Sequence, residues 1–509
     1  MRDVLAKGLA GAAGLLLTSC AVGPNFAPPP APDVTRYTPE PLSSPRANSG
    51  GPRVAQQHFV TGADISARWW AAFRSAPLND LIRLSVEHNP TLQSAEAAIS
   101  VAYFNAQAQR GLFFPQVAAN YTASGQQLSN MATSLPGDPP QTRFALHTAQ
   151  LNISFVPDIW GLNFRAVESL DAITEQAQFQ LEAAYLALTA NVVTAAVQEA
   201  SLRGQIAATE RIIRIGRDIL GILKNQFNAG QVARVDVLTQ ETALAQAEET
   251  LPPLQKQLAV QRDLLTALAG QFSADEILQK FDLEHLALPR NLPVSLPSTL
   301  VDQRPDVRAA EASLHSAGAL VGVAIAARLP NLSLTGNPGS SAFKPAELFT
   351  PGTVFYTVAS SATQTVFDGF TLYHRQKAAE AALDQAGALY RQVVITALQN
   401  VADALRSLQA DARAVQAAIK AENAAKASLD IVQKQLVLGQ INQVTVLNAQ
   451  QAYLNTAIAR VQAQATRLAD TAALFMALGG GWPLGCTTPV WRECVMEDVP
   501  ATVQVTEAK

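Results

Sequence analysis

Three cysteines and six histidines are the residues of this chain whose types could support covalent chemistry or metal binding. The histidines, at positions 58, 88, 147, 285, 315 and 374, show no metal-ligand spacing such as HExxH, and there is no CxxC pair. GGG at 479–481 lacks the Lys-Ser/Thr of a phosphate-binding loop, and no nucleophile elbow occurs. We therefore expect no enzyme activity, no cofactor and no metal site.

Cys20 follows a stretch with the layout of a bacterial secretory signal. Two basic residues precede an apolar run from about Leu9 to Leu17, which is too short to span a bilayer as a helix. The tetrapeptide LTSC at 17–20 resembles the lipobox of bacterial lipoproteins, in which the cysteine is acylated through sulfur and becomes the new N-terminus. We predict a lipoprotein signal peptide at residues 1–19 and lipidation of Cys20. A plain signal peptide or a buried first helix is the alternative.

Cys486 and Cys494 are the ends of CTTPVWREC near the C-terminus. Export would place them in an oxidising compartment, so we expect a small disulfide loop, with a pair of free thiols as the alternative. This loop would lie in a C-terminal tail, residues 483–509. The proline-rich residues 20–62 are expected to form an extended tether from the lipid to the body of the protein.

Composition favours helices and excludes nucleic-acid binding. The chain has 509 residues, of which 48% are apolar and 6% aromatic, and Ala, Leu and Val supply most of the apolar content, as in long, closely packed helices. The formal charge of −4 becomes −5 without residues 1–19, and there is no clustered basic face. We expect no transmembrane helix after the signal, because no later segment is long and continuous enough.

The sequence contains an internal repeat. NPTLQSAEAAI from Asn89 aligns with RPDVRAAEASL from Arg304, and GQVARVDVLTQE from Gly230 aligns with GQINQVTVLNAQ from Gly439. The offsets are 215 and 209, so the first copy is longer by six residues. We predict two structural repeats, at residues 63–290 and 291–482, each beginning with a helix.

Each repeat is expected to contain a β-hairpin, at about residues 113–157 and 330–367. In HTAQLNISF, Leu151, Ile153 and Phe155 alternate with polar residues that include Gln150 and Asn152, which is the period of a strand with one apolar and one polar face. Loop compositions at 125–143 and 336–352 lie between alternating segments. The sequence therefore predicts four strands per chain.

Long helical hairpins are expected at about residues 162–270 and 371–478. No proline occurs from Asp158 to Leu251 or from Gly352 to Trp482, and apolar residues recur there at spacings of three and four. A helix from residue 163 to 228 would be about 100 Å long at ~1.5 Å per residue. An ordinary coiled coil would explain the helices, but not the hairpins.

Four amphipathic strands in one chain have two open edges. Unpaired amides in hydrocarbon cost several kcal/mol each, and a closed membrane barrel takes about eight strands or more. Several chains must therefore share a barrel, and three would supply twelve strands. Polar faces would line a lumen and apolar faces would meet lipid. Aromatic residues at the strand ends would form an interfacial girdle, or pack as core aromatics at the helix-to-strand junctions: Phe113, Phe114, Trp160, Phe367 and Phe370.

These motifs together resemble the TolC-type outer-membrane efflux proteins, and in particular their NodT-like lipoprotein branch. The resemblance rests on CAVGPNF after the lipobox, RWWAAF from Arg68, the two glycine turns and ALGGGW at 477–482, and it covers roughly residues 15–482. It implies a mainly α protein with a small β part: a homotrimer with a shared twelve-stranded transmembrane β-barrel and a twelve-helix periplasmic α-barrel.

The function that this resemblance implies is the exit duct of an RND-type tripartite efflux pump. The duct would conduct drugs or other small toxic compounds passively from a periplasmic adaptor and an inner-membrane transporter, and acylation, for example with palmitate, would anchor it in the outer membrane at Cys20. An outlet for type I-like polypeptide secretion, or a periplasm-spanning structural lipoprotein without a pore, is the alternative.

The two glycine turns would be the periplasmic tips. Gly230 and Gly439 can adopt the positive φ of a helix C-cap. The resemblance implies that the tips contact the adaptor and form the gate. Some relatives have an aspartate where this chain has Ile441, so we expect an apolar constriction. The residues assigned to the tips are Gly230, Val232, Val235, Asp236, Leu238, Gly439, Ile441, Val444, Val446 and Leu447.

Overall fold

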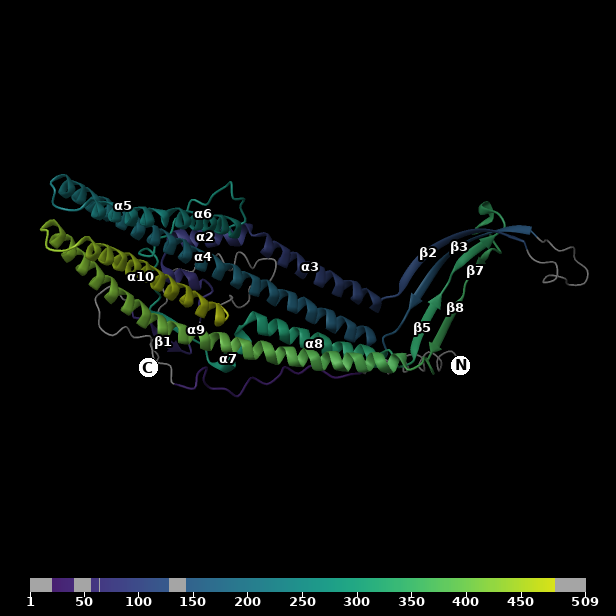
Figure 1. Cartoon of the computed structure of the whole chain (residues 1–509). Coiled ribbons are helices and arrows are strands. Elements are labelled where there is room, and N and C mark those ends of the chain that lie inside the picture. The colour runs from purple at the N-terminus through teal and green to yellow at the C-terminus, as the bar shows by residue number, and fades with distance from the viewer. Residues whose placement is uncertain (1–20, 41–55, 64, 128–142, 481–509) are drawn as a thin grey trace, which may run out of the picture. The chain divides into compact units, whose positions relative to one another are not determined.

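The computed structural model describes residues 21–40, 56–63, 65–127 and 143–480 (Figure 1). The predictions for the signal peptide, Cys20, Cys486, Cys494 and the tail lie outside these residues. The chain separates into two compact units. We call Met1–Pro29, Ala97–Gln178 and Ala309–Arg391 the strand unit, and Pro30–Glu96, Phe179–Arg308 and Gln392–Lys509 the tip unit.

The strands of the strand unit form one antiparallel sheet. β2 (Gln116–Gln127) pairs along its whole length with β3 (Arg143–Phe155). The other side of β3 pairs with β5 (Asn331–Gly336) and with β6 (Gly339–Ala342). β5 pairs with β8 (Val358–Thr363), and β6 pairs with β7 (Val354–Phe355).

The short strands are pieces of two longer ribbons. Asn337 and Pro338 separate β5 from β6, and proline has no N–H to donate to a ladder. The backbone of Asn337 nevertheless exchanges hydrogen bonds of 2.8 and 3.3 Å with Thr357, and Leu151 donates to the carbonyl of Pro338 at 2.9 Å. The described sheet therefore has four ribbons, in the order β2, β3, β5/β6 and β8/β7.

Helices flank the strands in the same order in both halves of the chain. α3 (Pro90–Arg110) and α8 (Pro305–Ala326) precede the strands. α4 (Leu162–Asn228) and α9 (Thr371–Val437) follow them, each with 67 residues. In the first half α5 (Arg234–Glu249) and α6 (Leu251–Leu268) then return, and in the second half α10 (Gln443–Ala477) does so.

The first returning helix is broken where one helix was predicted. The break lies at Thr250, and Pro252 and Pro253 occupy the first turn of α6. Proline is tolerated at the start of a helix but lacks the N–H that a helix interior needs. Two consecutive prolines therefore account for the division between α5 and α6.

The helical faces of the tip unit pack through small and branched side chains. The apolar residues that recur at spacings of three and four include buried positions on both helices: Leu181, Leu188 and Val192 on α4, and Val401 and Leu408 on α9. A Cβ on Gly204 of α4 would come within 2.9 Å of a methyl group of Val461 on α10. Small residues thus let these helices approach closely.

Aromatic residues anchor the N-terminal part of the tip unit. A 3-10 helix, η1 (Trp69–Phe73), precedes α2 (Ala76–His88), and both of its tryptophans are buried. Trp69 stacks on Phe475 with ring centroids 5.4 Å apart, and Trp70 meets Tyr185 edge-on at 6.2 Å. The RWWAAF motif therefore forms part of the helical core.

The described part of the predicted tether, residues 21–40, forms no helix or strand, and it contacts other parts of the chain. The expectation was wrong for its end, because β1 (His58–Thr61) pairs in parallel with β4 (Asn291–Val294). α7 (Pro297–Gln303) follows β4. Residues 58–61 thus belong to the body of the tip unit.

Two described helices are long and apolar enough to cross a membrane by length and composition, contrary to the expectation that no segment after the signal would be. They are α4, whose apolar window is 61% buried inside the protein, and α8, whose window is 33% buried. Core helices meet the same criteria. The burial of α4 has its explanation in the helix packing described above.

Candidate functional site

The sheet has one apolar and one polar face. Residues directly opposite each other in an antiparallel pair point to the same side. On one side of β2 and β3, Val117 lies opposite Ile153 and Ala119 opposite Leu151. The other side carries Asn120 opposite Gln150, Thr122 opposite Thr148, Ser154 opposite Thr335 and Ser333 opposite Ser361. The alternation predicted for β3 is therefore correct, and it continues across the sheet.

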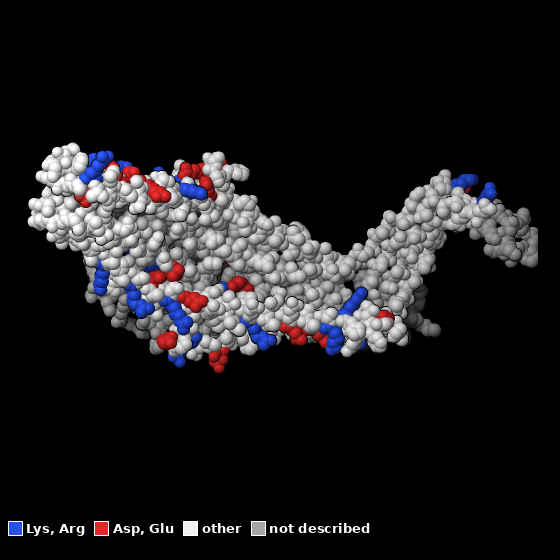
Figure 2. All heavy atoms as spheres, in the orientation of Figure 1, with Lys and Arg blue, Asp and Glu red and all other residues white. Residues whose placement is uncertain are grey.

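Charged side chains are almost absent from the described strands. Arg143, at the first residue of β3, is their one Lys, Arg, Asp or Glu. On the face that Figure 2 shows, the sheet is free of charged side chains along most of its length. The polar face thus offers hydroxyl and amide groups, which can line a water-filled passage without strong selection for charge.

Both edges of the sheet lack a partner strand within the described residues. β2 pairs with β3 alone, and β8 pairs with β5 alone. β2 has 12 residues, so a long row of backbone groups is left at this edge. Such an edge is incompatible with hydrocarbon unless another strand covers it.

Four of the five predicted girdle aromatics are exposed. Phe114, Phe367 and Phe370 are 69%, 78% and 65% exposed, and Phe113 is 38% exposed. Trp160 is half-buried and donates Nε1 to the carbonyl of Pro330 at 2.8 Å. The four phenylalanines are therefore not core residues of the single chain.

The glycines of both tips cap helices in the same way. Gly230 follows α4 with φ +71°, and Gly439 follows α9 with φ +68°. Gln231 donates its backbone N–H to the carbonyl of Gln226 at 2.8 Å, and Gly230 donates to Phe227 at 2.9 Å. The same two bonds recur at Gly439. This is the Schellman arrangement, so the expected C-caps are present.

The returning helices begin differently at the two tips. Asp236 accepts a hydrogen bond from the backbone N–H of Ala233 at 3.1 Å, which satisfies a donor at the start of α5. At the start of α10, the side chain of Asn442 accepts from the backbone N–H of Thr445 at 3.1 Å. The carboxylate of Asp236 thus has a structural role at its own turn.

The predicted tip residues divide into exposed and buried positions. Val235, Leu238 and Val444 are 64%, 49% and 59% exposed, and both glycines are exposed. Four others are half-buried: Val232, Asp236, Ile441 and Leu447. Val446 is fully buried in a cluster with Leu223, Val237 and Tyr453. The prediction for Val446 was therefore wrong as regards a contact surface, because its side chain belongs to the core.

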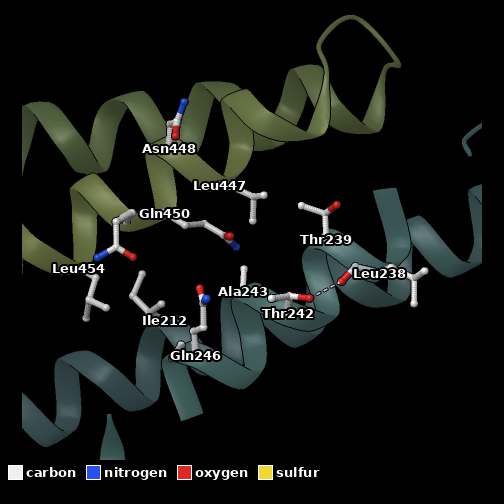
Figure 3. A pocket seen from close by; sticks show the side chains of 12 residues that line it. Ile212, Leu238, Thr239, Thr242, Ala243, Gln246, Leu447, Asn448, Gln450 and Leu454 are labelled. Carbon is white, nitrogen blue, oxygen red and sulfur yellow. Dashed lines mark hydrogen bonds between the residues drawn. The ribbon is translucent and has the colours of Figure 1, made fainter. Parts of the chain in front are cut away.

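A groove of about 490 Å³ lies between α5 and α10 near the tips. In Figure 3, Leu447 and Gln450 of α10 point toward Ala243 and Gln246 of α5. Thr, Gln and Asn side chains alternate with Leu along the groove, and no charged residue lines it. The groove thus offers hydroxyl, amide and aliphatic groups and no charge.

Charge is also absent from the second tip. Residues 435–459 contain no Lys, Arg, Asp or Glu. On the face shown in Figure 2, charged side chains lie along the helices, whereas the surface at the two turns is white. A ring of charge at the level of Ile441 is thus not available from this tip.

Two buried glutamines at the tips were not predicted. Gln443 of α10 donates its side-chain amide to Gln240 of α5, and Gln240 donates to the carbonyl of Gly216 on α4 at 3.1 Å. They do not occupy equivalent positions of the repeat, so neither the periodicity nor the alignment of the halves indicated them.

Acidic groups with raised pKa values lie among the helices of the tip unit. Burial, together with a hydrogen bond to Asp470, raises the pKa of Asp411 to about 7. Burial likewise raises the pKa of Glu182 to about 7, against the opposing effect of Arg308. Over the described residues, no group of three or more His, Cys, Asp or Glu side chains is arranged to hold a metal ion.

The sequence matches a family model and several characterised outer-membrane proteins. The model of the family described as "Outer membrane efflux protein" matches residues 81–271 and 296–480. The pyoverdine export outer membrane protein OpmQ of Pseudomonas putida is 27% identical over 82% of this chain and 88% of its own length. Outer membrane protein OprJ of Pseudomonas aeruginosa is 27% identical over 94% and 96%.

Solved structures of outer-membrane channels have the same fold. The outer-membrane channel OprN superposes with a TM-score of 0.79 at 24% identity, over 91% of this chain and all of that one. The CmeC channel of Campylobacter jejuni gives 0.81 at 21% identity, over 91% and 95%. The chain therefore belongs to the outer membrane efflux protein family, the TolC-type channels of efflux pumps.

Proposed function

We propose that three copies of this chain form one twelve-stranded barrel in the outer membrane, and that the trimer is the exit duct of a tripartite efflux pump. The observation that carries the proposal is the one-sided sheet with two unpartnered edges. Four ribbons cannot close on themselves, and barrels of the outer membrane have eight strands or more. Pairing of the β2 edge of one copy with the β8/β7 edge of the next would close the barrel.

In such a barrel one face of the sheet contacts lipid and the other contacts water. The face with Val117, Leu151 and Ile153 meets lipid, and the face with Gln150 and Asn152 lines the lumen. The exposed phenylalanines near the strand ends lie at the membrane interface, where aromatic girdles occur. The long helices of three copies form a twelve-helix periplasmic tunnel. The assembly conducts passively and catalyses no reaction.

Lipidation of Cys20 anchors the trimer in the outer membrane. The lipobox-like LTSC is followed by residues 21–25, which contact the strand unit at Trp160 and Arg165. The acyl groups thus enter the same membrane as the barrel. The disulfide between Cys486 and Cys494 is proposed as well, and thiol labelling before and after reduction tests it.

The tips bind a periplasmic adaptor, which connects the duct to an inner-membrane transporter. The groove between α5 and α10, with Leu238 and Leu447 on its walls, is the docking surface together with the exposed Val235 and Val444. Variants Val235→Asp and Leu238→Asp are expected to weaken adaptor binding. Val260→Asp, on an exposed position of α6, is the matched control.

The transported class is drugs or other small toxic compounds. Relatives include a protein named for solvent efflux, SrpC of Pseudomonas putida, and one named for pyoverdine export. A lumen of neutral hydroxyl and amide groups accepts compounds of diverse charge, so the transporter selects the substrate. Export of a radiolabelled drug from cells with and without the gene tests this assignment.

The gate is an apolar constriction that includes Ile441. The side chain is half-buried against the tip core, and the segment around it carries no charge. Planar-bilayer recordings of purified Ile441→Asp and Ile441→Ala trimers are expected to show a higher closed-state current than the parent. An unchanged current in both variants would remove Ile441 from the gate, while the absence of channels in all three proteins would contradict the proposed function itself.

A further inference from the structure

A largely apolar cavity lies in the strand unit, where the helices join the sheet. Its volume is about 430 Å³, within the range of small-molecule sites. Most of its lining is aliphatic or aromatic and comes from three segments, the residues that follow α3, the end of β3 with the residues after it, and the residues from the end of α8 into β5: Leu112, Phe114, Val156, Ile159, Trp160 and Leu332.

The described chain begins at the rim of this cavity. Val22 donates its backbone N–H to the carbonyl of Trp160 at 3.2 Å. A Cβ on Gly161 would lie 2.7 Å from the Cα of Ala21, so these two backbones are in contact. Trp160 and Leu162, the neighbours of Gly161, both line the cavity. The first described residues, Ala21 and Val22, therefore lie beside the cavity.

A buried arginine holds the start of the chain in this place. The side chain of Arg165, 3% exposed, donates to the carbonyl of Val22 at 3.1 Å, to the carbonyl of Gly23 at 3.3 Å and to Oδ1 of Asn25 at 2.7 Å. It also pairs with Glu168 at 2.7 Å. Donors bound to two successive carbonyls fix the backbone at residues 22 and 23, and the bond to Asn25 adds a side-chain contact.

Glu168 extends the network to the next part of the segment. Its second oxygen lies 3.0 Å from Nε2 of His315, and the ring of His315 stacks on Phe26 at 4.2 Å between centroids. Burial acts to raise the pKa of Glu168, but hydrogen bonds from Arg165 and His315 outweigh burial and lower it. The carboxylate is thus ionised, as the Arg165 contact requires.

The cavity also contains a hydrogen-bond donor without a partner. Asn163 lines it and is 8% exposed. Its Oδ1 accepts from Gln109 at 2.7 Å, but its Nδ2 has no acceptor among the described atoms. A buried amide donor left in this way costs free energy, so a ligand that brings a carbonyl oxygen would be favoured there.

We propose that this cavity holds an acyl chain carried by Cys20, with Asn163 donating to a carbonyl of the acyl linkage. The proposal rests on the lipidation proposed above. Three observations select this occupant over others: the position of Ala21, the residue after Cys20, at the rim, the apolar lining and the unpaired donor. The N-terminal lipid is then a structural part of the junction between helices and sheet, in addition to an anchor.

Photo-crosslinking of the intact trimer tests the proposal. Cells are grown with a palmitate analogue that carries a diazirine, membranes are irradiated, and peptides joined through the acyl chain are identified by mass spectrometry. We expect the Cys20 peptide to be joined to residues 109–116, 154–163 or 326–332. A labelled Cys20 joined only to phospholipid, or to the apolar face of the sheet, overturns the cavity assignment while the lipid anchor stands. An unlabelled Cys20 overturns both.

The second measurement is the crosslink yield of a variant in which a large side chain blocks the cavity. Ala327 is exposed at the rim, and Ala327→Trp places an indole in the entrance. We expect severalfold fewer crosslinks to the cavity segments, with the amount of trimer unchanged. Leu320→Trp, on an exposed position of α8 outside the cavity, is the control and should leave the crosslinks as they are. Equal crosslinking in both variants contradicts the proposal. Crosslinks from a photoactivatable phospholipid to the cavity segments, without crosslinks from the Cys20 peptide, also contradict it.

Discussion

Gln443 of α10 donates its side-chain amide to Oε1 of Gln240 on α5, and the two side chains are only 5% and 1% exposed. Gln240 also reaches the carbonyl of Gly216 on α4. These contacts join the two helical hairpins of one chain close to the turns. Any opening motion that separates α5 from α10 must break this buried bond.

The first prediction concerns this bond. Gln443→Leu leaves Oε1 of Gln240 buried without its donor, which should lower the free energy of unfolding by about 1–3 kcal/mol. The double variant Gln240→Leu and Gln443→Leu removes both polar groups and should recover most of the loss. Thermal unfolding of the detergent-solubilised protein measures both effects. If the single and double variants lose equal stability, the coupling is absent.

The second prediction concerns the tip glycines. A side chain at Gly230 or Gly439 meets no atom within 4 Å, but the positive φ is strained for any L-residue. Alanine should therefore cost about 1–2 kcal/mol at either position. Gly221 lies inside α4, also in open space and without a positive φ, and Gly221→Ala should stabilise by about 0.5–1 kcal/mol. Opposite signs in the melting temperatures support the account, and a common sign refutes it.

Neighbouring residues of β3 provide the third prediction. Leu151 is on the apolar face and Gln150 on the polar face of the sheet. Lysine on a lipid-facing position costs up to about 2–4 kcal/mol, so Leu151→Lys should reduce the yield of trimer in the outer membrane. Gln150→Lys should assemble normally and shift the conductance toward anions. The reverse result would mean that the lumen and lipid faces are exchanged.

The fourth prediction is a pH dependence. The ordinary pKa of aspartate is 3.8, and that of Asp411 in the folded chain is about 7 because of burial and the hydrogen bond to Asp470. The folded chain therefore binds this proton more tightly than the unfolded chain does. The resulting stabilisation of the fold is complete below about pH 4 and is lost as the pH rises through about 7. Arg467 of α10 also faces this carboxyl and opposes the shift. Glu182 contributes in the same direction.

Asp411→Asn, which resembles the protonated form, should remain more stable than the parent at pH 8 and lose most of that advantage at pH 5. Melting temperatures at the two pH values measure the difference. Asp384→Asn, an exposed position on α9, serves as the control. A parallel pH response of the parent and Asp411→Asn would show that Asp411 is ionised throughout.

The features that the sequence predicts well are the local ones. The alternation around Leu151 gives the two faces of β3 because the strand period is fixed by the backbone. The absence of proline allows α4 to continue for 67 residues, and Gly230 ends it through its positive φ. Each of these inferences needs only a few neighbouring residues.

The features that it misses depend on contacts between distant segments. The sequence predicts that His58–Thr61 is part of the tether. Its pairing with Asn291–Val294 joins segments far apart in the sequence, so no local pattern indicates it. Val446 has the spacing of a tip residue, but which face of α10 is buried depends on the helices packed against it. The break at Thr250 is the exception, because Pro252 and Pro253 carried a local signal.

The central claim is that the open edges of the sheet are covered by further copies of the same chain. The mature protein can be extracted in mild detergent and its mass, corrected for bound detergent, measured by light scattering. The account predicts the mass of three chains, each close to the 54.0 kDa of the full sequence. A stable monomer in detergent would leave β2 and β8 without partners and would contradict the shared barrel.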